Sequence, residues 1–403
     1  MTAPAAGIAA APLNPLALPA ISASYFALGV NMLAPIGLVA EMAGDLGVST
    51  GAVAYLLSAS ALAYAVTAPI LQMLIGAWDR RGLIIIGLAL AAAGSLLCAA
   101  APVFAAALVG RAIMGAGFAL IGPMATAMAA SIVAPQRSGQ AIGVALMGMS
   151  IASVVGVPLV TFAGAQAGWR LAMTGAAALC FAVIAMLRWS APSGSRGARA
   201  TPLAMLAALK DPVLAPALLS PFFQFAAQYA THAMIAVFLM ERFHAPAALI
   251  PMALMTIGVS GVLGSTLIAW LQGRARADVL ITLALGALGL VFVALLFAPA
   301  APWLTFVLLV CWGAAGATAL PPMSGRLVAL AGESRNMVLA LNSALLQCGI
   351  AAGAAIAGLA YDAFGARMLP LASLALLILS ALAYGISRHC EKRRAAAPPP
   401  AAA

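Results

Sequence analysis

Long apolar runs alternate with short polar gaps along almost the whole chain. Each run has about 20 residues, the length that crosses the hydrocarbon core of a bilayer as an α-helix. The runs are too long for the strands of a membrane barrel. Because backbone groups inside a bilayer must be paired within the chain, the pattern predicts an all-α membrane protein. We expect about twelve spans, centred near Leu28, Leu62, Ala91, Phe118, Ile151, Ala178, Met234, Ser260, Leu288, Gly313, Ile350 and Leu376.

Charged residues are scarce and occur mainly in the polar gaps. They make up 7% of the 403 residues, whereas hydrophobic residues make up 65%, and a soluble fold of this length needs a more charged surface. If the N-terminus is cytoplasmic, 15 of the 19 Lys and Arg residues lie in cytoplasmic segments. Arg170, Arg242 and Arg367 lie outside, and Arg111 lies within a span. This asymmetry obeys the positive-inside rule, so the net charge of +10 encodes orientation, with both termini cytoplasmic, rather than a nucleic-acid partner.

The second half of the chain repeats features of the first half at an offset of 197 to 199 residues. The repeated pairs are Arg170 and Arg367, Arg137 and Arg335, Gly117 and Gly316, Gly156 and Gly353, and Pro123-Met124 and Pro322-Met323. Parallel six-helix repeats place a transport site at their interface, near the bilayer midplane. We predict a cytoplasmic N-terminal segment (1–14), a six-helix bundle (15–190), a cytoplasmic linker (191–213), a second six-helix bundle (214–388) and a cytoplasmic tail (389–403).

Small residues recur four positions apart at matching places in the two halves. Such a stripe lets two helix backbones approach closely in a membrane. Chance in an alanine-rich chain explains one stripe, but the repetition favours a pair of close-packed helices. The stripes are Gly148, Ala152 and Gly156, and Gly349, Gly353 and Ala357.

Six local motifs, in the right order, resemble the major facilitator superfamily, and specifically its bacterial branch of drug:proton antiporters and sugar-efflux proteins. They include an outer loop after the first span, the loop Gly76–Arg81, Gly110-Arg111 with Gly115 and Gly117, Gly148 through Pro158, Gly168-Trp169-Arg170, and Leu341-Asn342-Ser343. The resemblance covers residues 15–390 and implies a transporter of a bacterial inner membrane.

The loop with Asp79, Arg80 and Arg81 resembles the family's gating loop, in which an acid locks the two halves together in one state. A purely structural role for Asp79 remains an alternative. The loop is shorter than is usual for the family. Many relatives also carry an embedded acid where this chain has Asn31 and Met32, so the family's pattern of proton coupling cannot be copied directly.

Polar residues inside the apolar spans are candidates for the wall of a substrate cavity. A buried guanidinium is costly in lipid unless it is paired or hydrated, so Arg111 either binds an anionic group or donates to backbone carbonyls of neighbouring helices. On the seventh span, Gln224, Gln228, Thr231 and His232 form a polar stripe, because residues four and seven or eight apart share one helix face. We expect this polar stripe and Arg111 to face one cavity. The full set of candidates is Asn31, Arg111, Gln224, Gln228, Tyr229, His232, Asn342 and Gln347.

Few groups in the chain are suited to proton coupling. His232 is the one imidazole well inside a span, and imidazole titrates near neutral pH. Arg111 can modulate such a site. Glu41 and Asp45 are four residues apart at the outer end of the first span. They either collect protons from outside or are a solvated helix end.

The sequence therefore favours a secondary transporter that exports a small molecule, such as a drug, sugar or metabolite, in exchange for protons by alternating access. A facilitator or proton symporter is the alternative. An intramembrane enzyme is a remote alternative, because the three histidines lie far apart in the sequence and the chain has no pair of membrane-embedded acids. We expect a monomer in the lipid bilayer, with no metal or other cofactor.

Overall fold

The structure is a computed structural model that describes residues 14–195 and 209–396. In these ranges the regular structure is helical, with no strand, which confirms the all-α prediction. The predicted N-terminal segment, linker and tail fall largely or partly outside the described residues, together with Arg196 and Arg199.

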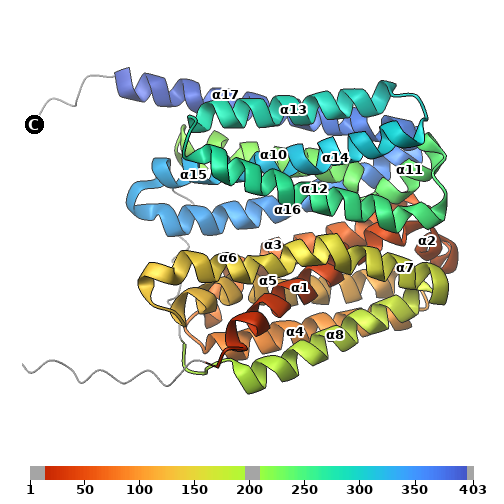
Figure 1. The fold of residues 1–403 in the computed structure, drawn as a ribbon, viewed down its shortest axis with the longest axis horizontal. Coiled ribbons are helices and arrows are strands. Elements are labelled where there is room, and N and C mark those ends of the chain that lie inside the picture. The colour runs from red at the N-terminus through yellow and green to blue at the C-terminus, as the bar shows by residue number, and fades with distance from the viewer. Residues whose placement is uncertain (1–13, 196–208, 397–403) are drawn as a thin grey trace, which may run out of the picture.

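Eight helices form the N-terminal half (14–195) and eight form the C-terminal half (209–396), and the two groups lie one below the other in Figure 1. The first group comprises α1 (Ala17–Leu33), α2 (Val39–Leu46), α3 (Ala54–Ile75), α4 (Arg80–Ala100), α5 (Phe104–Ser131), α6 (Ser138–Ile151), α7 (Val157–Ala167) and α8 (Trp169–Ser190). The second comprises α10 (Leu214–His232), α11 (Ile235–Phe243), α12 (Ile250–Gln272), α13 (Ala277–Phe297), α14 (Pro302–Thr318), α15 (Leu320–Ala331), α16 (Arg335–Phe364) and α17 (Leu369–Ala396).

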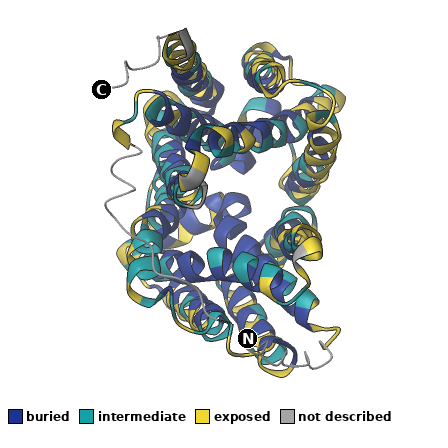
Figure 2. Ribbon diagram, turned by 90° about the vertical axis from the view of Figure 1, so that its left-hand side faces the viewer, coloured by how far each residue is buried: buried dark blue, intermediate teal, exposed yellow. Residues whose placement is uncertain are grey.

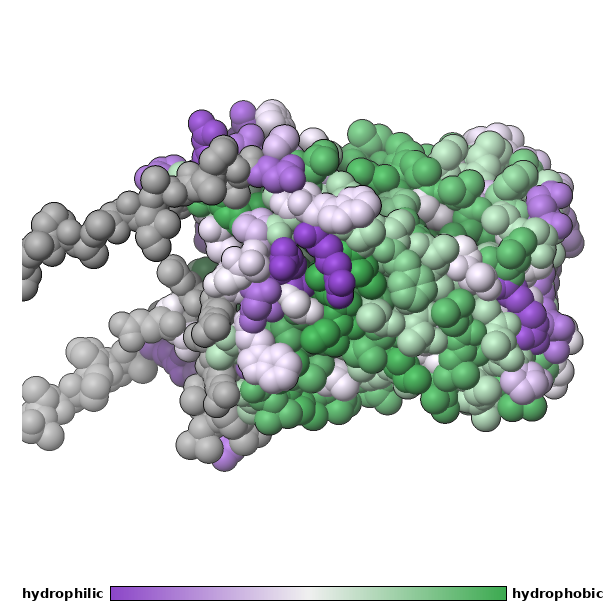
Figure 3. Space-filling view, turned by 90° about the horizontal axis from the view of Figure 1, so that it is seen from below, coloured by the Kyte–Doolittle hydropathy of each residue, from purple (hydrophilic) through white to green (hydrophobic). Residues whose placement is uncertain are grey.

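Eleven helical segments of the described chain are long and apolar enough to cross a membrane. The pair α10 and α11 bends by 52° and supplies a twelfth span when the two helices are taken as one. This count agrees with the prediction of about twelve spans. Figure 3 shows the matching surface, a broad apolar band between two ends at which hydrophilic residues gather.

The band consists of side chains that a soluble protein would bury. Leu263, Leu283 and Leu290 are 63%, 64% and 72% exposed. Seen from one end of the bundle, the exposed residues lie mainly on the outward sides of the helices (Figure 2). Lipid is the environment that such a surface fits, so the chain is a multi-pass membrane protein.

Both small-residue stripes lie where two helices nearly touch, as predicted. A Cβ at Gly148 would clash with the carbonyl oxygen of Ser22 on α1, and one at Gly349 would clash with that of Phe222 on α10. Gly353 packs in the same way against Ala226. The stripe on α6 thus packs on α1, and the stripe on α16 packs on α10, which is the equivalent pairing in the two halves.

Two helices become irregular next to the interface between the halves, and the local sequence explains one of these irregularities. Helix α1 gives way to a tighter turn at Ala34–Gly37, where Pro35 has no N–H for the helical hydrogen bond. The span formed by α6 and α7 widens into a π-helical turn at Ala152–Gly156. Such turns occur frequently at functional sites, and this one carries Ser153 to the interface.

Candidate functional site

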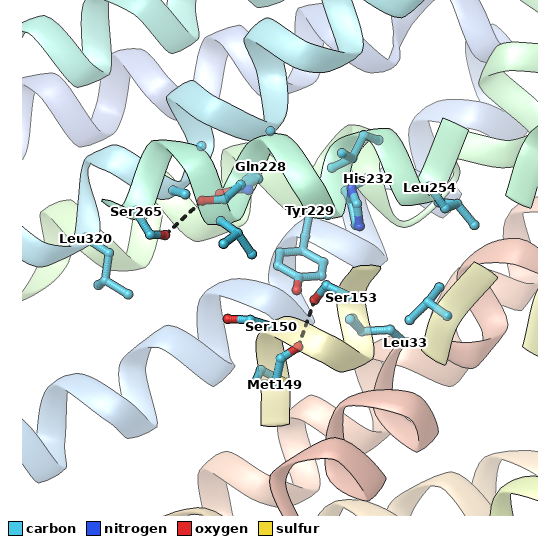
Figure 4. Close-up of a pocket in the computed structure, with 18 of the residues that line it drawn as sticks. Leu33, Met149, Ser150, Ser153, Gln228, Tyr229, His232, Leu254, Ser265 and Leu320 are labelled. Carbon is cyan, nitrogen blue, oxygen red and sulfur yellow. Dashed lines mark hydrogen bonds between the residues drawn. The ribbon is translucent and has the colours of Figure 1, made fainter. Parts of the chain in front are cut away.

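A cavity of about 380 Å³ lies between the two halves. Figure 4 shows Met149, Ser150 and Ser153 on one wall, opposite Gln228 and Tyr229 on the other. The remaining lining residues are Leu33, Val157, Phe225, His232, Leu254, Ile257, Gly258, Gly261, Val262, Ser265, Gly313, Gly316, Ala317, Leu320 and Pro321. None of these side chains carries a carboxylate, an ammonium or a guanidinium group.

Helix α10 supplies the polar stripe predicted for the seventh span. The amide of Gln224 donates to the side-chain oxygen of Gln228 at 3.2 Å and to the carbonyl of Gly316 at 3.4 Å. Gln224 is fully buried behind Gln228, which itself faces the cavity. A side chain at Gly316 would meet the Gln228 amide at 2.6 Å, so this glycine makes room for Gln228. Gln224 therefore positions Gln228 from behind.

His232 lies one helical turn beyond Gln228, among aromatic rings. Its ring meets that of Tyr229 edge-on with centroids 5.5 Å apart, and that of Trp312 at 5.8 Å. Its Nδ1 atom is buried and has no hydrogen-bond partner among the described residues. Tyr229 also stacks on Phe225 at 6.4 Å. The cavity wall thus combines aromatic rings with an imidazole whose Nδ1 is buried and has no partner in the described structure.

Arg111 lies away from this cavity, inside the N-terminal half. Its guanidinium is fully buried and donates to the carbonyl oxygens of Leu56 (3.0 Å), Asn31 (2.7 Å) and Met32 (2.8 Å), and to the hydroxyl of Ser60 (2.8 Å). The carbonyl of Asn31 lacks a helical donor because residue 35 is proline. In this conformation the structure therefore contradicts the prediction that Arg111 and Gln228 share one cavity, and it shows the alternative arrangement, in which Arg111 pairs backbone groups of α1 and α3.

The other amide candidates lie outside the cavity lining. The side-chain nitrogen of Asn31 donates to the carbonyls of Ala27 at 2.9 Å and Ala176 at 3.3 Å. Asn342 and Gln347 lie on α16. The side-chain oxygens of all three amides are buried and have no partner among the described residues. None of the three lines the cavity in this conformation.

The two acids at the outer end of the first span differ in their surroundings. Asp45 accepts from Trp169 Nε1 at 2.9 Å and from the guanidinium of Arg170 at 2.9 Å. Arg170 also donates to the carbonyls of Ala99 and Ala101, where α4 ends. Asp45 therefore ties α2 to α4 and α8. Glu41 is exposed, and both acids lie remote from the cavity lining.

Among the described residues, the loop predicted to gate the protein binds only its own half in this conformation. Asp79 accepts from the backbone N–H of Gly82, as the cap of α4, and from that of Gly194 at 2.7 Å. Arg80 donates to Ser195 Oγ at 2.9 Å, and Arg81 donates to the carbonyl of Ala191 at 3.0 Å. All three residues thus hold the segment that follows α8.

The halves meet tightly at the end of the molecule that carries Asp45. Asp362 on α16 accepts from Ser49 Oγ at 2.7 Å and from the N–H of Gly51 at 3.1 Å. Ser58 Oγ on α3 donates to the carbonyl of Ala351 at 2.8 Å. Gly51 and Gly358 pack backbone against backbone. This end of the cavity is therefore closed.

The cavity extends towards the opposite end, which carries Arg80, Arg137, Arg188, Arg274 and Arg388 and is called the basic end below. Helix α12 begins at the closed end, and its lining residues run from Leu254 to Ser265, two turns before the basic end. A bundle that is closed at one end, with a cavity reaching towards the other, is one state of a protein that exposes a central site to each side in turn.

Comparison with known proteins decides the family. Residues 20–331 match the model of the Major Facilitator Superfamily. The chain belongs to the Major Facilitator Superfamily. It is 29% identical over 369 residues to the inner membrane transport protein YdhP of Escherichia coli K12, over 89% of this chain and 94% of that protein. The resemblance stated from sequence motifs is thereby confirmed, and the chain is a membrane transporter and not an enzyme.

Two further relatives have informative names. A chloramphenicol resistance protein of Streptomyces lividans is 32% identical over 66% of this chain and 69% of its own length. The purine ribonucleoside efflux pump NepI of Salmonella paratyphi B is 27% identical over 86% of this chain and 87% of its own length.

Among solved structures, a bacterial homologue of the human lysosomal transporter Spinster, in an inward-facing and unoccupied conformation, shares the fold. The TM-score is 0.71 at 16% identity, over 93% of this chain and 96% of that one.

Sequence reasoning missed the serines that face α10 across the cavity. Ser150 and Ser153 lie between the small residues of the stripe at Gly148, Ala152 and Gly156, and Ser265 lies on α12. The spacing of the stripe by itself predicts only a packing surface. The sequence does contain a signal for these residues, because two hydroxyls lie between the glycines of the stripe. A helix that presents small residues to one neighbour can present polar residues to a cavity beside it.

Proposed function

We propose that this transporter exports an uncharged small molecule from the cytoplasm in exchange for protons. The observation that carries the proposal is the cavity wall, which offers aromatic rings, hydroxyls and an amide but no charged side chain. Inside a low-dielectric bundle, an ionic solute needs a countercharge. A neutral solute needs only apolar contact and a few placed hydrogen-bonding groups. Purine ribonucleosides and chloramphenicol, which appear in the names of two relatives, are both uncharged at neutral pH.

The distribution of arginines supports the orientation in which the basic end faces the cytoplasm. The cavity then reaches towards the cytoplasm and is closed towards the outside, the state in which an exporter loads. Cysteines introduced near Gln166 and Phe243 should react with a membrane-impermeant reagent added to intact cells. A cysteine near Arg196 should not, and its labelling from outside would reverse the orientation.

His232 is the coupling residue that this cavity favours. Aromatic rings surround it, and its free Nδ1 can take up a proton without breaking a hydrogen bond in the described structure. Charged side chains are absent from the cavity lining formed by the described residues, so protonation of His232 would add a formal charge to an uncharged wall. His232→Gln keeps hydrogen bonding and should abolish the pH dependence of export, whereas His389→Gln on the exposed tail end of α17 should not. An unchanged pH profile in His232→Gln would exclude this role.

The charge preference of the cavity can be measured on purified protein by equilibrium dialysis. We expect radiolabelled adenosine to bind more tightly than its anionic 5′-monophosphate or the permanent cation tetraphenylphosphonium. Gln228→Glu should invert the preference towards the cation, because it adds a carboxylate to the wall. Gln166→Glu, the same change on the exposed end of α7, should leave the preference as it is. Equal binding of adenosine and the cation by the unmodified protein would contradict an uncharged substrate.

A further inference from the structure

A second cavity lies on the outer surface of the C-terminal half, where α13 begins and α17 ends. It has a volume of about 300 Å³ and is lined by Arg276, Asp278, Val279, Thr282, Leu283 and Arg388. The two helices lie side by side along the upper edge of Figure 1, and Tyr384 of α17 donates to Asp278 of α13 at 2.7 Å. The transport cavity shares none of these residues.

The charges around this cavity leave one guanidinium unpaired. Asp278 forms an ion pair with Arg388 at 3.1 Å. Arg326 binds Glu391 and Ser387 on α17. Arg276 is exposed, and its side chain has no hydrogen bond or ion pair with the described residues. At this cavity Arg276 is therefore an unpaired cation among the described residues, and Arg388 has a single ion-pair partner.

Exposed apolar surface continues from this cavity along α13 and α17. Val279 and Leu283, which line the cavity, are 50% and 64% exposed, and Ile386 on α17 is 55% exposed. A Cβ added at Gly286 on α13 or at Gly385 on α17 would meet no atom within 4 Å. The surface beside these two glycines is therefore open to a lipid chain.

We propose that this site binds one anionic phospholipid, with the phosphate between Arg276 and Arg388 and an acyl chain along the apolar surface past Gly286. A guanidinium matches phosphate with two parallel hydrogen bonds. Basic pockets between membrane helices near the polar ends of the spans bind such headgroups. The apolar continuation argues for a phospholipid rather than a free anion, because a free anion would leave it unused.

Arg276 is the residue of choice for the test, because the described fold does not depend on its side chain. The thermal stability of the purified protein in a neutral detergent is measured against increasing phosphatidylglycerol or phosphatidylcholine with the same acyl chains. We expect a saturable rise in melting temperature with phosphatidylglycerol only. Arg276→Gln should raise the half-saturating concentration about tenfold, as expected from the loss of a charge-assisted hydrogen bond. Arg274→Gln should not, because that guanidinium stacks on Trp270 at 4.0 Å instead of lining the site.

A second variant tests the contact with the acyl chain independently of charge. A Cβ at Gly286 meets no atom within 4 Å, so Gly286→Leu should weaken the phosphatidylglycerol response while leaving the melting temperature in detergent alone unchanged. The proposal is overturned if phosphatidylcholine gives an equal response, or if Arg276→Gln responds like the unmodified protein. It is also overturned if inorganic phosphate reproduces the effect, because the site would then bind a free anion.

Discussion

Replacing Arg111 with methionine tests whether this arginine supports the fold or binds substrate. The change keeps an extended side chain but removes the donors to the carbonyls of Asn31, Met32 and Leu56 and to Ser60. An orphaned buried acceptor costs about 1–3 kcal/mol. The two carbonyls at the end of α1 therefore give a loss of about 2–6 kcal/mol. Removal of a desolvated charge offsets part of this loss, so we expect about 2–4 kcal/mol.

The assay is the free energy of unfolding in mixed micelles, measured by titration with a denaturing detergent. Arg274→Met, which removes an exposed guanidinium, is the matched control and should cost less than about 0.5 kcal/mol. Pro35→Ala restores an N–H for the Asn31 carbonyl, so the double variant with Arg111→Met should lose less stability than the sum of the two single variants. Normal stability of Arg111→Met together with lost substrate binding would refute the structural role.

Three other variants test separate contacts. Asp362→Asn weakens the link to Ser49 that closes one end of the cavity, so cysteines placed in the cavity should become more reactive towards reagents added from that side; unchanged reactivity would contradict the role of this link. Gly148→Val should prevent accumulation of folded protein, whereas Gly139→Val should be tolerated because no atom lies within 4 Å of its added Cβ; equal expression of the two would contradict the close helix contact. Asp45→Asn loses an exposed ion pair worth about 0–1 kcal/mol and should leave the pH profile of transport unchanged, and a shifted profile would return Asp45 to the coupling candidates.

The fold could be predicted because a bilayer restricts the choice so strongly. Runs of about 20 apolar residues leave a helical bundle as the one sensible class. The repeated stripes at Gly148 and Gly349 also identified two equivalent close helix contacts, because backbone approach depends on the absence of a side chain at given positions. The position of the break in the span near Met234 could not be predicted from the sequence. The bend between α10 and α11 coincides with no proline or glycine.

The candidate site could be predicted only in part. Polarity within an apolar span identified Gln228, Tyr229 and His232, and these residues do line the cavity. Polarity does not distinguish a side chain that faces a cavity from one that completes the backbone hydrogen bonds of a neighbouring helix. Arg111 is of the second kind, and the need for it arises at Pro35, 76 residues earlier in the chain. That pairing depends on how α1, α3 and α5 pack, which the sequence pattern does not contain.

Flux into proteoliposomes under an imposed pH gradient is the most direct test of proton-driven export of an uncharged solute through the cavity at Gln228. Antiport carries the solute towards the more acidic side in either orientation of the inserted protein. We predict that radiolabelled adenosine or chloramphenicol accumulates in vesicles with an acidic lumen, that a protonophore abolishes the accumulation, and that Gln228→Ala reduces it while Gln166→Ala does not. Accumulation with an alkaline lumen instead, or equal flux without a gradient, would contradict the account.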